Sequence, residues 1–192
     1  MTKHNCIFIH IPKAAGTSIL SALDGSDRFV QRDHCTALDF IKADKKTFEA
    51  SYKFCFVREP VDRIQSVYRY LSSGGNKTTN IELSSIINNE YSNFDEFVDG
   101  FISYDNIFCN KLLFPQYHFV CNIEGKLLVQ NIFRYENIKA GFLEVCNELG
   151  IDKDLPLINP SIKEKSSIEI DTKNKIKEIY SRDYDYFYPE LR

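Results

Sequence analysis

The chain has 192 residues, of which 43% are hydrophobic and 27% are charged, and its formal net charge is −3. These totals are typical of one soluble domain over residues 1–192, and they do not favour non-specific binding to nucleic acid or to a membrane surface. No segment reaches the roughly 18 apolar residues that a membrane-spanning helix needs.

The six cysteines form neither a metal-binding nor a redox pattern. The sequence has no CxxC pair and no His or Cys at metal-ligand spacing, so we expect no bound metal. The first segment, MTKHNCIFIHIP, leads into a turn rather than a small-residue cleavage site, which favours a cytoplasmic protein with reduced thiols. A Cys109–Cys121 disulfide in an exported form is the alternative.

The first half of the chain alternates between strands and helices. In chain order, we expect a strand over residues 6–11, CIFIHI, because a continuous apolar run is typical of a buried parallel strand. A helix over 17–23 and a short strand over 28–31 follow. Residues 36–43 have helical spacing, with Leu38 and Ile41 on one side. The next strand covers 52–57, YKFCFV, and Pro60 begins the helix behind it.

The second half is mostly helical. Residues 72–80, SSGGNKTTN, form a loop that is either a lid or a plain surface connection. Helices are predicted over 81–89, 94–102 and 106–114, a strand over 126–133, a helix over 138–150 that ends at Gly150, and a last helix over 171–182. Strands that alternate with helices indicate a three-layer α/β domain, in which helices flank a central parallel sheet.

The turn after the first strand has the chemistry of an anion site. The segment IHIPKAAGTSI places Lys13 and the small residues Ala14, Ala15 and Gly16 ahead of a helix that begins near Thr17. The start of a helix presents unpaired N–H groups and a partial positive charge. Small side chains let a phosphate approach the backbone, and Thr17 and Ser18 add hydroxyl donors. The lysine precedes the glycine, so the loop is not a Walker A sequence.

A second cationic group follows the second strand. Arg58 ends the segment FCFVR, and Ser66 lies about 140° around the helix from Val61 and about 160° from Ile64, away from the apolar stripe. Arg58 and Ser66 could therefore converge on a second phosphate. The alternative is that Arg58 forms a structural ion pair with Glu59 or Asp62.

The two segments IHIPKAAGTSI and FVREPVDRIQSVY together resemble the nucleotide signatures of sulfotransferases that use 3′-phosphoadenosine 5′-phosphosulfate (PAPS). The resemblance is to the carbohydrate and heparan sulfate 2-O-sulfotransferase-like group with its bacterial members. It covers nearly the whole chain, because FPQYHF, FRYENI, NPS and the terminal YSRDYDYFYPEL occur in the family's order.

The resemblance implies a P-loop-NTPase-like fold, PAPS as co-substrate and a hydroxyl of a carbohydrate or glycolipid as acceptor. It assigns the 5′-phosphosulfate to the first loop, where the residues are Lys13, Ala14, Ala15, Gly16, Thr17 and Ser18. It assigns the 3′-phosphate to Arg58 and Ser66, and the role of general base to His34, with Lys13 stabilising the leaving group. His34 could instead be a capping or surface residue beside Asp33.

The resemblance also points to residues in the second half of the chain. Arg134, Tyr135 and Glu136 either brace the site or form an internal Arg–Glu pair. Asn159 and Ser161 are candidates for contact with the nucleotide, and His118 either contacts the acceptor or is a surface residue. Two other classes remain open, a P-loop-like kinase that uses ATP and magnesium, and a non-catalytic nucleotide-binding module. The sequence specifies neither the acceptor nor the oligomeric state.

Overall fold

The computed structural model describes residues 6–24, 34–76, 79–156 and 167–192. The chain forms two compact units, one from residues 1–58 and 116–160 and the other from residues 59–115 and 161–192. The single domain over residues 1–192 stays a prediction.

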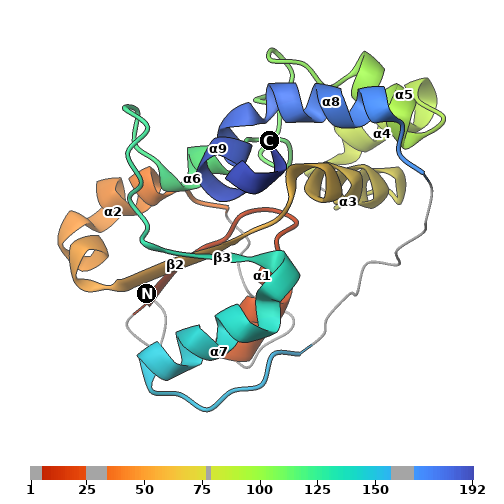
Figure 1. Ribbon diagram of the computed structural model, residues 1–192. Coiled ribbons are helices and arrows are strands. Elements are labelled where there is room, and N and C mark those ends of the chain that lie inside the picture. Colours follow the sequence, from red (N-terminus) through yellow and green to blue (C-terminus); the bar gives the residue numbers. More distant parts are fainter. Residues whose placement is uncertain (1–5, 25–33, 77–78, 157–166) are drawn as a thin grey trace. The chain divides into compact units, whose positions relative to one another are not determined.

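In its described residues, the first unit contains a parallel sheet of three strands (Figure 1). The strands are β1 (Cys6–Ile9), β2 (Tyr52–Val57) and β3 (Asn131–Arg134), in the order β1-β2-β3. Ile9 pairs with Cys55, and Val57 pairs with Arg134. Because all three strands run in the same direction, the residues that follow them leave from one edge of the sheet. The predicted α/β fold with a parallel sheet flanked by helices is therefore confirmed.

Helices of the first unit cover the sheet and its loops. They are α1 (Gly16–Asp24), α2 (Ala37–Ala50), α6 (Tyr117–Val120), the 3₁₀ turn η1 (Tyr135–Asn137) and α7 (Ile138–Leu149). A capping box between Thr36 and Asp39 starts α2, and Gly150, with φ 62°, ends α7 as predicted. Helix α7 packs closely on β3, since a Cβ on Gly141 would lie only 2.9 Å from the Cβ of Phe133.

The second unit is a helical cluster with its own apolar core. Its helices are α3 (Pro60–Ser72), α4 (Ile81–Glu90), α5 (Phe94–Gly100), α8 (Ile170–Ile179), α9 (Ser181–Phe187) and the 3₁₀ turn η2 (Pro189–Leu191). Ile64, Val67, Phe97 and Ile176 have no exposed surface and join α3, α5 and α8 in one core.

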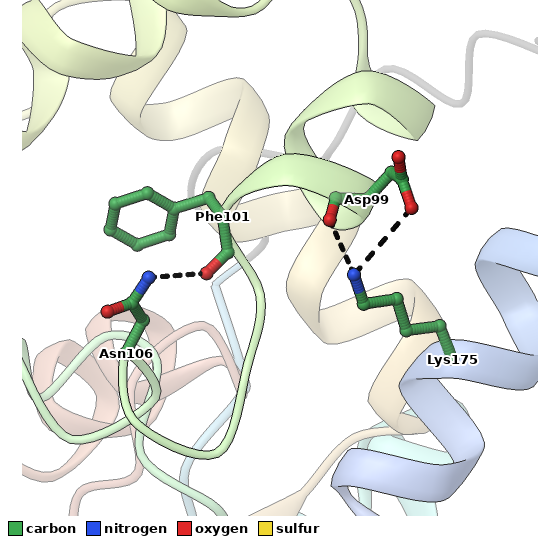
Figure 2. Close-up of polar contacts among 4 residues, drawn as sticks. All are labelled: Asp99, Phe101, Asn106 and Lys175. Atoms are coloured by element: carbon green, nitrogen blue, oxygen red, sulfur yellow. Dashed lines mark hydrogen bonds and ion pairs between the residues drawn. The ribbon is translucent and has the colours of Figure 1, made fainter.

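Polar contacts at the surface of the second unit add to this packing. Figure 2 shows Lys175 of α8 bound to the main-chain oxygen of Asp99 and, at 3.7 Å, to its carboxylate. The carboxylate is largely exposed, so the ion pair itself adds little stability and the apolar core carries most of it.

Several predicted elements differ from the observed ones. Residues 106–114 form turns rather than a helix. Asn side chains there bind the local backbone: Asn106 Nδ2 donates to the Phe101 carbonyl at 2.9 Å (Figure 2), and Asn110 Oδ1 accepts from the Leu112 N–H at 3.0 Å. Such side-chain bonds compete with helical ones.

Two further element boundaries and the exposure of one side chain differ from the prediction. The strand predicted over 126–133 begins only at Asn131, and the last helix is two helices that meet at Tyr180. Leu38, expected on a buried side of its helix, is 39% exposed. The strand predicted over 28–31 lies outside the described residues.

Within the ranges that the structure describes, no helix is both long enough and apolar enough to cross a membrane. No disulfide joins the six cysteines, all of which lie in the described ranges, and burial raises the pKa of the Cys55 thiol, which has no exposed surface.

Candidate functional site

The loop between β1 and α1 has the backbone of a tight, strained turn. Lys13 and Ala15 both adopt left-handed conformations, with φ 64° and 66°. Residues other than glycine rarely adopt these backbone angles, and those that do cluster at functional sites. The chain reverses here so that α1 begins at Gly16, directly at the sheet edge. The N–H groups of its first turn have no acceptor within the helix, which is the arrangement that attracts an anion.

Gly16 allows the ring of His10 to lie against this turn. A Cβ on Gly16 would be 1.8 Å from His10 Nε2 and 2.0 Å from His10 Cδ2, so no larger residue fits without moving the ring. The His10 ring also lies against Phe8, with the ring centres 5.7 Å apart. The start of α1 therefore packs directly on the end of the first strand.

His34 lies beside the same loop. Its ring centre is 4.3 Å from that of His10, and its Nδ1 is 3.0 Å from the His10 carbonyl oxygen. Because a carbonyl can only accept, the Nδ1–H of His34 donates, and in the neutral ring Nε2 carries the lone pair. His34 has φ 44°, a third left-handed residue at this edge. The contact fixes the tautomer that a general base using Nε2 requires.

Arg58 follows the last residue of β2 and is buried, with 6% of its surface exposed. Gln116 holds its main chain: Oε1 accepts the Arg58 N–H at 2.9 Å, and Nε2 donates to the Arg58 carbonyl at 2.8 Å. The guanidinium carbon lies 4.5 Å from the centre of the Tyr135 ring. In the part of the chain that the structure describes, the buried Nε has no hydrogen-bond partner and no carboxylate forms an ion pair with the guanidinium.

Among the described residues, no ion pair joins Arg58 to Glu59 or Asp62. The Glu59 carboxylate accepts the N–H of Asp62 at 2.8 Å and the hydroxyl proton of Tyr184. A buried guanidinium without a counter-charge is costly, and a bound anion is one way to offset that cost.

The first unit thus brings most of the predicted site residues to one edge of its sheet. The Lys13–Ser18 loop leaves β1, Arg58 leaves the neighbouring β2, and His34 lies against the end of β1. Ser66 belongs to α3 in the second unit, where it is 8% exposed rather than facing solvent. Its predicted convergence with Arg58 stays a prediction.

Other residues singled out in the sequence have mixed outcomes. Tyr135 packs against Arg58 and so braces it. Burial lowers the pKa of His118, and the nearby Asp39 carboxylate partly opposes that shift. Asn159 and Ser161 lie outside the described residues.

Sequence reasoning gave Gln116 no role. The only signal was a polar residue inside the largely apolar segment FPQYHF, which is compatible with a buried amide but does not identify its partner.

No group of three or more His, Cys, Asp or Glu residues in the described ranges is arranged to hold a metal ion.

The fold and the turn between β1 and α1 define an α/β protein of the P-loop-like class. A family model described as "Sulfotransferase family" matches residues 1–189, so the chain belongs to the sulfotransferase family and is a transferase of sulfuryl groups. No curated protein and no solved structure matches the chain significantly.

Proposed function

We propose that this sulfotransferase uses PAPS as its donor and transfers the sulfuryl group to a hydroxyl of a carbohydrate or glycolipid. The observation that carries the donor assignment is Arg58, buried at 6% exposure without a carboxylate partner in the described ranges, one strand away from the Lys13 loop. Two cationic groups at one sheet edge suit a ligand that carries two separate anionic groups. The acceptor class and a cytoplasmic location rest on the sequence alone.

The donor's two ends have separate partners in this proposal. The N–H groups at the start of α1, with Lys13 and the Thr17 and Ser18 hydroxyls, hold the 5′-phosphosulfate. Ala14, Ala15 and Gly16 leave room for it at the backbone. The Arg58 guanidinium holds the 3′-phosphate, and the motif resemblance adds Ser66 as a second residue that binds it.

His34 is the proposed general base. The acceptor oxygen attacks the sulfur, the bond from sulfur to the 5′-phosphate oxygen breaks, and the acceptor proton passes to His34 Nε2. The leaving group is adenosine 3′,5′-bisphosphate. Negative charge grows on its 5′-phosphate oxygen, where Lys13 and the helix N–H groups stabilise it. The hydrogen bond from His34 Nδ1–H to the His10 carbonyl supports this role, because it leaves Nε2 as the proton acceptor.

Calorimetric titration of the Arg58→Ala variant tests the donor assignment. It should weaken the binding of adenosine 3′,5′-bisphosphate by about 1.5–3 kcal/mol, the value of a hydrogen bond to a charged group. Binding of adenosine 5′-phosphate, which lacks the 3′ group, should barely change. Lys45→Ala removes one exposed positive charge from α2 in the same unit and serves as the control, with both affinities unchanged. Equal losses for both nucleotides in the Arg58 variant would refute the assignment.

Transfer of labelled sulfate from PAPS to a panel of oligosaccharides and glycolipids tests the reaction itself. Repeated turnover with a carbohydrate acceptor is the expected result. Tight nucleotide binding without transfer to any acceptor would instead support a binding module.

A further inference from the structure

Gln116 completes the hydrogen bonding of β2 beyond its last paired residue. The strand ends at Val57, whose partner across the sheet is Arg134. At the next residue, Arg58, the buried side-chain amide of Gln116 supplies both the acceptor and the donor that a neighbouring peptide group would supply. The main chain of Arg58 is therefore held as firmly as a strand residue, although it lies outside the sheet.

Tyr135 holds the other end of the same residue. It directly follows Arg134, so the register between β2 and β3 places its ring next to Arg58. The guanidinium carbon lies 4.5 Å from the ring centre, within the range of a cation–π contact. The aromatic face attracts the cation without using its N–H groups, so those groups stay available to bind an anion.

A long arginine side chain normally loses much of its freedom when it binds a phosphate. Arg58 has lost that freedom before any ligand arrives, because its main chain and its guanidinium are held from two elements of the first unit.

We propose that Gln116 and Tyr135 are positioning residues that hold Arg58 ready for the 3′-phosphate of the donor. This inference rests on the proposed use of PAPS, and it gives the segments FPQYHF and FRYENI a role in nucleotide binding. The Tyr135 contribution comes from the face of its ring, and its hydroxyl is not needed.

The test compares two nucleotides by calorimetry in matched variants. Tyr135→Leu should weaken the binding of adenosine 3′,5′-bisphosphate by about 3-fold to 30-fold, the range of a cation–π contact. Tyr135→Phe should retain the wild-type affinity. Gln116→Met keeps the side-chain volume but loses both hydrogen bonds to Arg58, and it should weaken bisphosphate binding by about tenfold. Adenosine 5′-phosphate should bind all four proteins with similar affinity.

A merely structural role gives a different pattern. Tyr52→Leu changes a tyrosine at the opposite end of β2 and is the control for general destabilisation, with an unchanged ratio of the two affinities. If Tyr135→Leu and Gln116→Met weaken both nucleotides equally, or neither, the inference is wrong while the proposed donor stands.

Two outcomes remain, and both are decisive. If Gln116→Met does not fold, the comparison of Tyr135→Leu with Tyr135→Phe still decides the role of the ring. If the wild-type protein binds adenosine 5′-phosphate and the bisphosphate equally well, the proposed donor itself fails and the inference fails with it.

Discussion

Gly16→Ala is expected to destabilise the protein through one contact. The new Cβ would lie 1.8 Å from His10 Nε2, and the His10 ring has little room to move because Phe8 and His34 lie against it. Forcing one methyl group into such a contact costs about 1–3 kcal/mol.

Once the His10 ring is removed, Gly16→Ala should increase the free energy of unfolding instead of lowering it. In a His10→Ala background the Cβ meets no imidazole, and alanine is a better helix former than glycine by about 0.5–1 kcal/mol. The propensity gain is the same in both backgrounds and cancels, so the coupling energy between the two positions is about 1–3 kcal/mol, and it arises from a single steric contact.

Urea unfolding of the four proteins in this double-mutant cycle, followed by circular dichroism, measures the coupling. Gly150→Ala is a matched control: Gly150 has φ 62° and nothing lies within 4 Å of where a Cβ would be, so alanine there should cost about 1–2 kcal/mol in either background. A coupling energy between Gly16 and His10 below about 0.5 kcal/mol would refute the reasoning.

Two further predictions concern single side chains. His34→Asn can keep a donor to the His10 carbonyl, and asparagine tolerates the left-handed φ of 44°, so the loop and its nucleotide affinity should be retained. Because the imidazole is lost, turnover should fall about 10²–10⁴-fold. An unchanged rate of sulfuryl transfer would rule out His34 as the base. Burial, and then the hydrogen bond to the Glu59 carboxylate, raises the pKa of the Tyr184 hydroxyl. The stability that the neutral hydroxyl provides should be present below about pH 10 and lost as the pH rises further, so Tyr184→Phe should flatten this alkaline loss in urea titrations. An equally steep alkaline loss of stability in Tyr184→Phe would contradict the role of the Tyr184 hydroxyl.

Local patterns in the sequence predicted the elements that position the site. The apolar run over 52–57 matches β2 residue for residue, Pro60 begins α3, and Gly150 ends α7. Each of these signals is local. An apolar run, a proline at the first helical position and a glycine at a helix end can each be recognised from a few adjacent residues.

The environment of Ser66 could not be predicted in this way. The helical wheel assumes one buried stripe, whereas α3 also buries residues away from it, including Arg63 and Gln65. Arg63 is fully buried because its guanidinium donates to the carbonyl oxygens of Leu112 and Phe114. Acceptors this far away in the sequence leave no mark on the periodicity of the helix itself.

The supports of Arg58 were beyond sequence reasoning for the same reason. Gln116 lies 58 residues further along the chain, and Tyr135 reaches Arg58 through the register of β2 and β3. Neither contact follows from a motif, since each depends on which segments the fold brings side by side. The sequence indicated that Arg58 binds an anion, but it could not show what keeps the arginine in place.

The hydrogen bonds between Gln116 and Arg58 also hold together the two ends of a long insertion in the first unit. Residues 59–115 leave the first unit directly after Arg58 and return to it at Gln116. The span between two tethered points can grow at small entropic cost, about 0.6 kcal/mol for each doubling of its length. Extra turns or whole helices can therefore be inserted into this span without stretching the strands that it connects. The segment between Arg58 and Gln116 can therefore diversify while the sheet edge at Arg58 keeps its dimensions.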